Sequence, residues 1–223
     1  MLLCRIMPHF PSEYVKEVSF LERGIGQRGD NALRRLHEKG FSVGIGLTEY
    51  YAGAIAVMSQ QNHIREYCPN DSTEKRFGSL SSTARWLQKN GGRAMFLLLS
   101  NCDFNTRLEG YGWTGIEPSN ELPDHPITSA YRLGERVLGK GLSKDFIQVV
   151  VSSTHSLYEP KAGIGLETWR SNPAATIYPK VGFVLITEAP DDELRPTLDS
   201  SYEDGQVLDR RMYMVYPDKL LEN

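Results

Sequence analysis

One run of residues constrains the fold more than any other: Arg132-Leu-Gly-Glu-Arg-Val-Leu-Gly-Lys-Gly-Leu-Ser143. Its pattern predicts a strand that breaks at glycines and a helix that starts directly afterwards. Such a turn points several backbone N–H groups at one spot, with the positive end of the helix dipole behind them. Gly139 and Gly141 let a ligand approach the backbone closely, because neither has a Cβ atom. We therefore predict a pyrophosphate-binding loop, with an ordinary strand–helix turn as the alternative.

A second run follows further along the chain: Asn172-Pro-Ala-Ala-Thr-Ile-Tyr-Pro-Lys-Val-Gly-Phe183. Asn172 is a suitable helix cap, and Pro173 suits the first helical position, where no backbone N–H is needed. The run therefore places Tyr178 near the end of a short helix and just before another strand.

In these ingredients and their order, the two runs resemble the GNAT superfamily of acyl-CoA-dependent N-acetyltransferases. The family's loop reads Arg/Gln-x-x-Gly-x-Gly/Ala, and two registers fit it. Arg136-Val-Leu-Gly139-Lys-Gly141 matches the letters, but Leu138-Gly-Lys-Gly141-Leu-Ser143 suits the following helix better and is preferred. The preferred register has Leu138 at the family's leading Arg, while Arg136 could still reach the phosphates. The family commonly has seven steps from its Asn to its Tyr, and this chain has six.

The resemblance implies acetyl-CoA as co-substrate. The backbone of Tyr131–Leu133 would bind the pantetheine arm like an added strand, and a backbone N–H near Leu133 would polarise the thioester carbonyl. Tyr178 would be the general acid that protonates the leaving thiolate, unless it only packs and positions the cofactor. Asn172 would bind the pantetheine or serve only as a helix cap. The full predicted cofactor-binding set is Tyr131, Leu133, Arg136, Leu138, Gly139, Lys140, Gly141, Leu142, Ser143 and Asn172.

Residues for the acceptor are harder to select. Predicted substrate-binding residues are Glu49, Tyr50, Trp113 and Glu117. Aromatic side chains on the acceptor side would recognise a cation or a flat substrate, although aromatic residues are more often core. The general base is left open among Glu49, Glu117, Asp124, His125 and Glu167.

Composition narrows the classes of partner. A net charge of −3 and a pI of about 6.0 give no basic excess for nucleic acid or an anionic membrane. We expect a small-molecule or peptide amine instead, and a homodimer is left open. The three cysteines form no zinc pattern and the five histidines do not pair at metal-ligand spacings, so no metal is expected. Met1–Phe10 is a poor signal peptide and no apolar run approaches a membrane span, so we expect a cytoplasmic protein.

Apolar periodicity and turn residues give an order of elements. Strands are predicted over 41–47, 94–99, 108–114, 127–133, 163–169, 183–188 and 210–216. Helices are predicted from Thr48 toward Glu66, from Asp71 with Glu74 as a capping box through 80–87, after Ser143, and after Asn172. This order is the GNAT order. It indicates an α/β (α+β) fold with a mixed sheet, and the resemblance to the GNAT superfamily implies that this central sheet is mostly antiparallel, with splayed central strands and flanking helices.

Residues 1–40 are predicted to be an N-terminal extension packed on the core, and 41–223 the GNAT-like acetyltransferase domain. Glu13–Leu21 reads as a short helix and Asn31–His37 as a second one. Gly24-Ile-Gly-Gln-Arg-Gly29 spells a dinucleotide fingerprint, but it lacks a buried strand before it and repeated βα units after it, and is taken as a loop.

These observations favour an N-acetyltransferase in which a primary amine attacks acetyl-CoA directly. The alternatives are a transferase of another acyl group or to oxygen, and a GNAT-like module that binds CoA without turnover. A nucleotide-binding oxidoreductase built on Gly24–Gly29 is a distant further alternative.

Overall fold

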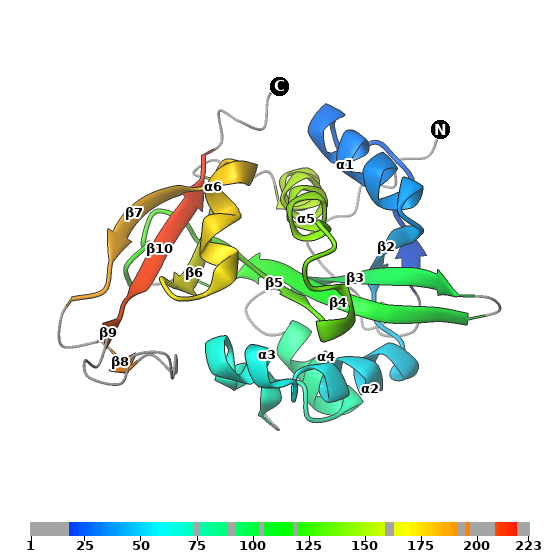
Figure 1. Cartoon of the computed structure of the whole chain (residues 1–223), viewed down its shortest axis with the longest axis horizontal. Coiled ribbons are helices and arrows are strands. Elements are labelled where there is room, and N and C mark those ends of the chain that lie inside the picture. Colours follow the sequence, from blue (N-terminus) through cyan, green and yellow to red (C-terminus); the bar gives the residue numbers. More distant parts are fainter. Residues whose placement is uncertain are drawn as a thin grey trace.

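The computed structural model describes residues 18–73, 76–88, 92–102, 105–117, 120–158, 163–190, 195–196 and 208–217. Within these ranges one large sheet runs through the molecule, with the strand order β1-β2-β3-β4-β5-β6-β10-β7 (Figure 1). Its strands are β1 (Val18–Phe20), β2 (Phe41–Gly46), β3 (Arg93–Cys102), β4 (Asn105–Ile116), β5 (Ile127–Leu133), β6 (Ile164–Trp169), β7 (Val184–Glu188) and β10 (Arg211–Tyr216). Strands β8 (Arg195–Pro196) and β9 (Leu208–Asp209) pair separately.

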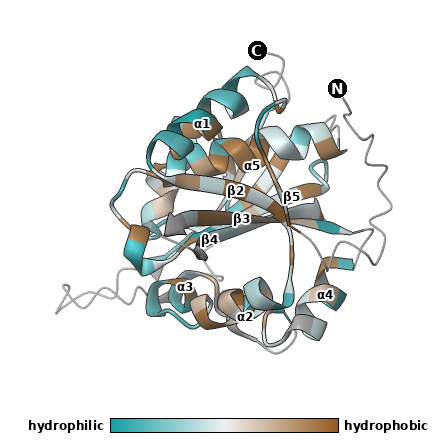
Figure 2. Ribbon diagram, turned by 90° about the vertical axis from the view of Figure 1, so that its right-hand side faces the viewer, coloured by the Kyte–Doolittle hydropathy of each residue, from teal (hydrophilic) through white to brown (hydrophobic). Residues whose placement is uncertain are grey.

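Helices cover both faces of the sheet (Figure 2). The α-helices are α1 (Gln27–Glu38), α2 (Glu49–Met58), α3 (Asn62–Tyr67), α4 (Leu80–Gln88), α5 (Ser143–Tyr158) and α6 (Tyr178–Val181). Short 3₁₀ turns are η2 (Pro69–Ser72), η4 (Glu135–Val137) and η5 (Pro173–Thr176). Helices α1 and α5 lie on one face, and α2, α3 and α4 lie on the other.

Strand β3 shows why the core divides into two. Its apolar run is buried on both faces, and alternate side chains point to opposite sides of the sheet. Ala94, Phe96 and Leu98 join the core under α1 and α5. Met95, Leu97 and Leu99 join the core under α2 and α4. One continuous hydrophobic run in the sequence thus contributes side chains to two separate cores, one on each face of the sheet.

The central strands part from one another, as the sequence predicts. Strands β5 and β6 run parallel and pair at Thr128↔Gly165, whereas the neighbouring pairs β4–β5 and β6–β10 are antiparallel and register along whole strands. The predicted mixed, mostly antiparallel α/β fold with splayed central strands is therefore confirmed. The opening beyond Thr128 is the feature that positions the site.

The described part of the N-terminal segment differs from the predicted helix over Glu13–Leu21. Residues Val18–Phe20 form β1, which pairs antiparallel with β2 from Val18↔Gly46 to Phe20↔Gly44, so that helix is wrong for these residues. Positions 13–17 and Val15 lie outside the described residues. The predicted helix at Asn31–His37 is confirmed, and it begins earlier, at Gln27.

The helix predicted from Thr48 toward Glu66 consists of two separate helices, α2 and α3. Thr48 caps α2 as expected, with its Oγ1 accepting from the backbone N of Tyr51 at 3.4 Å. The helix ends at Met58, however, and α3 starts anew at Asn62. Asp71 does not begin a helix, because it lies in η2 with its side chain buried, and Glu74 lies outside the described residues.

Helix α1 is part of the main core, because Ala32, Leu33 and Leu36 pack there and are at most 1% exposed. We expect Leu33→Ala to lower the free energy of unfolding by about 2–5 kcal/mol, as burial of the side chain is lost and a cavity remains. Urea denaturation measures this. The control is Val57→Ala on α2, at a position 73% exposed, with an expected change of about 0.5 kcal/mol or less. Equal, small effects of the two substitutions would show that α1 does not belong to the core.

Candidate active site between strands β5 and β6

The loop from Leu138 to Leu142 joins η4 to α5 and exposes backbone donors. Gly139 and Gly141 have φ values of 74° and 67°, a region that side chains with a Cβ disfavour. The backbone N of Phe146 donates to Leu142 O at 2.9 Å, which marks Leu142 as the cap of α5. The N–H groups of residues 142–145 therefore point out of the helix without intrahelical partners.

Two of the predicted loop donors are used inside the loop itself. The N–H of Leu138 bonds Glu135 O and that of Lys140 bonds Val137 O, both at 3.3 Å. The donors left for a ligand are those of Gly139, Gly141 and the first turn of α5. Arg136, Leu138 and Lys140 have exposed side chains, and Leu142 is buried. The loop thus offers backbone N–H groups, rather than a row of side chains, to a ligand.

Side chains from the end of α1 bind this loop and the first turn of α5. No sequence pattern indicated these contacts. Lys39 Nζ donates to Gly141 O at 3.0 Å and lies 3.5 Å from Asp145 Oδ2, and Arg35 Nε bonds Asp145 Oδ1 at 2.8 Å. Asp145 is buried in the first turn of α5, where a negative charge is favourable to the helix dipole.

Strand β5 turns part of its backbone toward the opening. Its register with β4 pairs Gly110 with Leu133, and Gly134 N donates to Glu109 O at 2.8 Å. Because hydrogen-bonded and non-hydrogen-bonded pairs alternate in an antiparallel ladder, the N–H and C=O groups of Tyr131 and Leu133 point away from β4. Their carbonyls already accept bonds, from Arg132 Nη1 and His63 Nε2, each at 2.8 Å. The two N–H groups are what β5 offers to a ligand in the opening.

Tyr178 lies at the opening with its ring buried. It begins α6, after η5, whereas the sequence placed it near the end of a single helix. Its ring centroid is 6.2 Å from that of Tyr131, so two phenols adjoin the outward-facing backbone of β5. Burial raises the pKa of Tyr178 to about 12, against an opposing effect of the Arg132 charge, so the hydroxyl is protonated at neutral pH.

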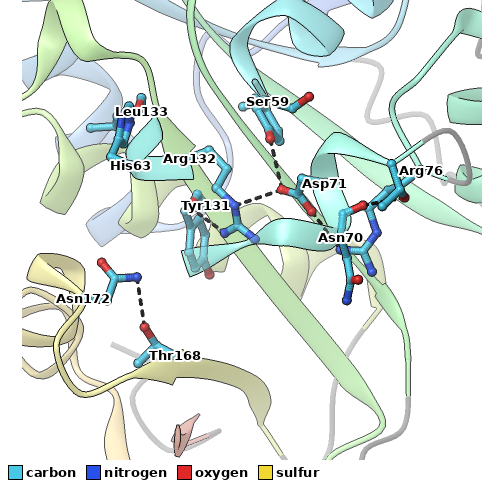
Figure 3. Close-up of polar contacts among 12 residues, drawn as sticks. Ser59, His63, Asn70, Asp71, Arg76, Tyr131, Arg132, Leu133, Thr168 and Asn172 are labelled. Atoms are coloured by element: carbon cyan, nitrogen blue, oxygen red, sulfur yellow. Dashed lines mark hydrogen bonds and ion pairs between the residues drawn. The ribbon is translucent and has the colours of Figure 1, made fainter. Parts of the chain in front are cut away.

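Asn172 is a helix cap, which is one of the two roles that the sequence analysis left open for it. Its Oδ1 accepts from Ala174 N at 2.9 Å, and its Nδ2 donates to Thr168 Oγ1 at 3.2 Å (Figure 3). Its side chain also lines the pocket described next.

A pocket of about 390 Å³ lies where β5 and β6 separate. It is large enough for a small organic molecule. Side chains from both strands form its walls together with residues of α3, η2, β4 and β10. The lining residues are Tyr67, Cys68, Asn70, Asp71, Arg76, Trp113, Glu117, Thr128, Ser129, Ala130, Arg132, Leu166, Glu167, Thr168, Trp169, Asn172, Tyr178 and Arg211.

Asp71 is the most buried charged group of the pocket, with none of its surface exposed. Its Oδ1 is 2.8 Å from Arg76 Nη1, and its Oδ2 accepts from Arg132 Nε at 2.9 Å (Figure 3). Its Oδ2 also accepts from the Tyr111 hydroxyl at 3.0 Å. Sequence reasoning missed this cluster. The available signal was Arg132, a charge within an otherwise buried strand, which needs a partner.

The predicted acceptor residues separate into two groups. Trp113, Glu117 and Glu167 line the pocket. Partial burial raises the pKa of Glu167 above its ordinary value, against the charge of Arg211, 3.6 Å away. Glu49 and Tyr50 lie exposed at the start of α2, and the structure does not bring them into the pocket lining; nor does it bring Asp124 or His125 there.

In the ranges that the structure describes, no group of three or more His, Cys, Asp or Glu side chains is arranged to hold a metal ion. Likewise, none of the described helices has the length and apolar character needed to cross a membrane.

Solved structures with a similar fold include N-acetyltransferases. Spermidine N-acetyltransferase from Vibrio cholerae, in complex with CoA and spermine, superimposes with a TM-score of 0.56 at 16% identity, over 80% of this chain and 96% of its own. A GCN5-related N-acetyltransferase from Kribbella flavida matches with a TM-score of 0.54 at 12% identity, over 79% and 98%. A GNAT-family acetyltransferase from Bacillus anthracis gives 0.53 at 13%, over 79% and 95%. No family model matches the sequence, and no curated protein does. The chain has the GNAT fold.

We expect Asp71→Asn to lower the free energy of unfolding by about 3–5 kcal/mol, because it leaves Arg76 and Arg132 without their buried counter-charge. Chemical denaturation at neutral pH measures the change. Glu38→Gln is the matched control, since it removes an exposed i,i+4 partner of Arg34 at 3.9 Å and should change stability by less than about 0.5 kcal/mol. Equal stability of Asp71→Asn and the wild type would contradict the role given to the buried carboxylate.

Proposed function

We propose that this protein is an N-acetyltransferase that moves the acetyl group of acetyl-CoA to a primary amine by direct attack. One observation carries the proposal: the donor-bearing loop before α5 follows β5 in the chain, the N–H groups of Tyr131 and Leu133 point away from β4, and the buried Tyr178 lies beside Tyr131 and lines the pocket between β5 and β6. The GNAT fold supports the same reading.

The loop suits the pyrophosphate of CoA. The loop offers the backbone donors of Gly139, Gly141 and the first turn of α5, and the helix dipole favours a negative ligand. A Cβ atom at Gly139 would meet nothing within 4 Å, so the space beside the loop is open. The N–H groups of Tyr131 and Leu133 would then hold the pantetheine arm and polarise the thioester carbonyl.

The chemistry needs a proton donor and a proton acceptor. The amine nitrogen bonds to the carbonyl carbon, the carbon–sulfur bond breaks, and the thiolate takes the phenolic proton of Tyr178. The proton lost by the amine passes to the Glu167 carboxylate, directly or through water. A protonated phenol and a carboxylate of raised pKa that both line the pocket suit these two roles.

The alternatives make different predictions for acetyl-CoA consumption. Thiol release with amines but not alcohols is expected. Release with alcohols would indicate transfer to oxygen, and preference for longer acyl-CoA would indicate another acyl group. CoA binding without any thiol release would indicate a non-catalytic module. Cytoplasmic location and a homodimer remain predictions of the sequence.

We expect Gly141→Val to weaken CoA binding by about tenfold or more in calorimetry, since a branched side chain would intrude on the phosphate path and strain the loop. Gly26→Val is the matched control, because Gly26 also has a positive φ, of 84°, with open space around its Cβ position. It should bind CoA like the wild type. Loss of CoA binding in Gly26→Val together with wild-type binding in Gly141→Val would place the phosphate site at Gly24–Gly29 instead. Circular dichroism has to show that both variants are folded.

We expect Tyr178→Phe to lower kcat by about 10²–10⁴-fold at saturating amine while changing the KM for acetyl-CoA much less. A general acid acts in its protonated form, which is lost only as pH rises through the pKa. Since that pKa is about 12, the wild-type kcat should show no alkaline decline caused by Tyr178 up to about pH 10. An unchanged kcat in Tyr178→Phe would reduce the tyrosine to a packing role.

A further inference from the structure

Two side chains bond the carbonyl groups of β5 that point away from β4. His63, on α3, lies with its Nε2 atom 2.8 Å from Leu133 O (Figure 3). Arg132 Nη1 donates to Tyr131 O, also at 2.8 Å. Because a carbonyl oxygen only accepts, the Nε2 atom of His63 carries the hydrogen of its bond. Both outward carbonyl groups are thus occupied, and β5 offers the N–H groups of the same two residues to a ligand.

The peptide unit between Leu133 and Gly134 is held at both of its polar ends. Its N–H group, on Gly134, donates to Glu109 O at 2.8 Å. Its carbonyl group, on Leu133, accepts the bond from His63. The backbone is also closely packed here, because a Cβ atom at Gly134 would lie 3.1 Å from Met58 Cε. This end of β5 therefore has a fixed orientation, and His63 contributes to it from a different element.

The bond from His63 also affects what the strand is able to bind. In an extended residue the N–H and C=O groups point to the same side, so a ligand oxygen at Leu133 N–H lies near Leu133 O. Two oxygens with partial negative charge repel each other, and the repulsion grows as a carbonyl oxygen becomes an oxyanion. The N–H group of His63 offsets the partial charge of Leu133 O. The end of β5 is therefore suited to a ligand oxygen.

We infer, on the basis of the proposed function, that His63 is a positioning residue for the acetyl group, because its bond to Leu133 O directs Leu133 N–H at the thioester carbonyl oxygen. That oxygen becomes negative when the amine attacks, so a well-placed donor stabilises the transition state more than the bound cofactor. His63 is not among the residues that line the pocket, and its Nδ1 atom lies 3.8 Å from Glu135 Oε1. It therefore acts through Leu133.

Two variants of similar size separate the hydrogen bond from the rest of the side chain. The amide nitrogen of glutamine reaches the position of histidine Nε2, whereas that of asparagine reaches only the position of Nδ1. His63→Gln therefore keeps a donor for Leu133 O, and His63→Asn loses it. Gln61→Ala is the matched control. Gln61 Oε1 accepts from Glu135 N at 3.0 Å, so this variant loosens the same turn without changing the bonds of the outward carbonyl groups.

The first measurement needs no turnover. Acetyl-CoA with an isotope label at the thioester carbonyl is bound to the protein, and infrared spectroscopy records the C=O stretching frequency. A donor that polarises the carbonyl lowers this frequency. We expect the lowering in the wild type, in His63→Gln and in Gln61→Ala, and its loss in His63→Asn. The inference is overturned if the wild type shows no lowering, if His63→Asn retains it, or if His63→Gln or Gln61→Ala loses it.

The second measurement compares kcat with the affinity for CoA, which has no thioester carbonyl. His63→Asn should lower kcat by about tenfold or more, because the donor to the developing oxyanion is misplaced. His63→Gln should keep kcat within about threefold of the wild type, and CoA affinity in calorimetry should stay within about threefold in every variant. If His63→Asn lowers CoA affinity as much as kcat, His63 only supports the structure of the site and the inference is wrong.

The inference and the proposed function fail separately in these experiments. If the wild type lowers the carbonyl frequency of acetyl-CoA but releases no thiol with any amine, acetyl transfer is refuted. The infrared comparison of His63→Gln with His63→Asn then still decides whether His63 positions the carbonyl donor. If thiol is released but the two variants give the same carbonyl frequency, the proposed function stands and the role of His63 is refuted.

Discussion

The parallel strands β5 and β6 pair at Thr128↔Gly165, and then they separate. A parallel neighbour would have covered the N–H groups of Tyr131 and Leu133; the separation leaves them facing an opening instead. The loop before α5 lies at one end of this opening, and Tyr178 and the pocket lie beside it. In the proposed function, the positions of the cofactor, the general acid and the acceptor all depend on where these two strands part.

The separation is stabilised from both faces of the sheet. On one face α5 is held between the sheet and α1, with ten consecutive buried residues from Asp145 to Thr154. On the other face, the carbonyl groups of β5 that point into the opening are bonded by Arg132 and His63. Arg132 is itself held by Asp71. The buried ion pair of Asp71 and Arg132 and the outward-facing backbone of β5 are therefore linked by direct bonds.

Local sequence patterns predicted much of the fold and the glycine loop of the candidate site. The run from Arg132 to Ser143 encodes its turn in its glycines, and β3 encodes a strand in its apolar residues, because both depend on neighbours in sequence. Asp71 was misread as a helix cap, since a carboxylate near a helix start has the same local pattern whether its partner is a backbone N–H or an arginine on β5. Val18–Phe20 was misread because pairing with β2 decides its conformation. Lys39 at the loop is likewise a tertiary contact between distant segments.

Hydrogen–deuterium exchange with and without CoA tests the central claim most directly, because it reads the backbone donors on which the site depends. The account predicts that CoA slows exchange at Tyr131 and Leu133 and at the amides of Gly139, Gly141 and the first turn of α5. The exposed surface of α2 should be unaffected. Unchanged exchange along β5 and the loop in the presence of saturating CoA, or protection confined to Gly24–Gly29, would contradict it.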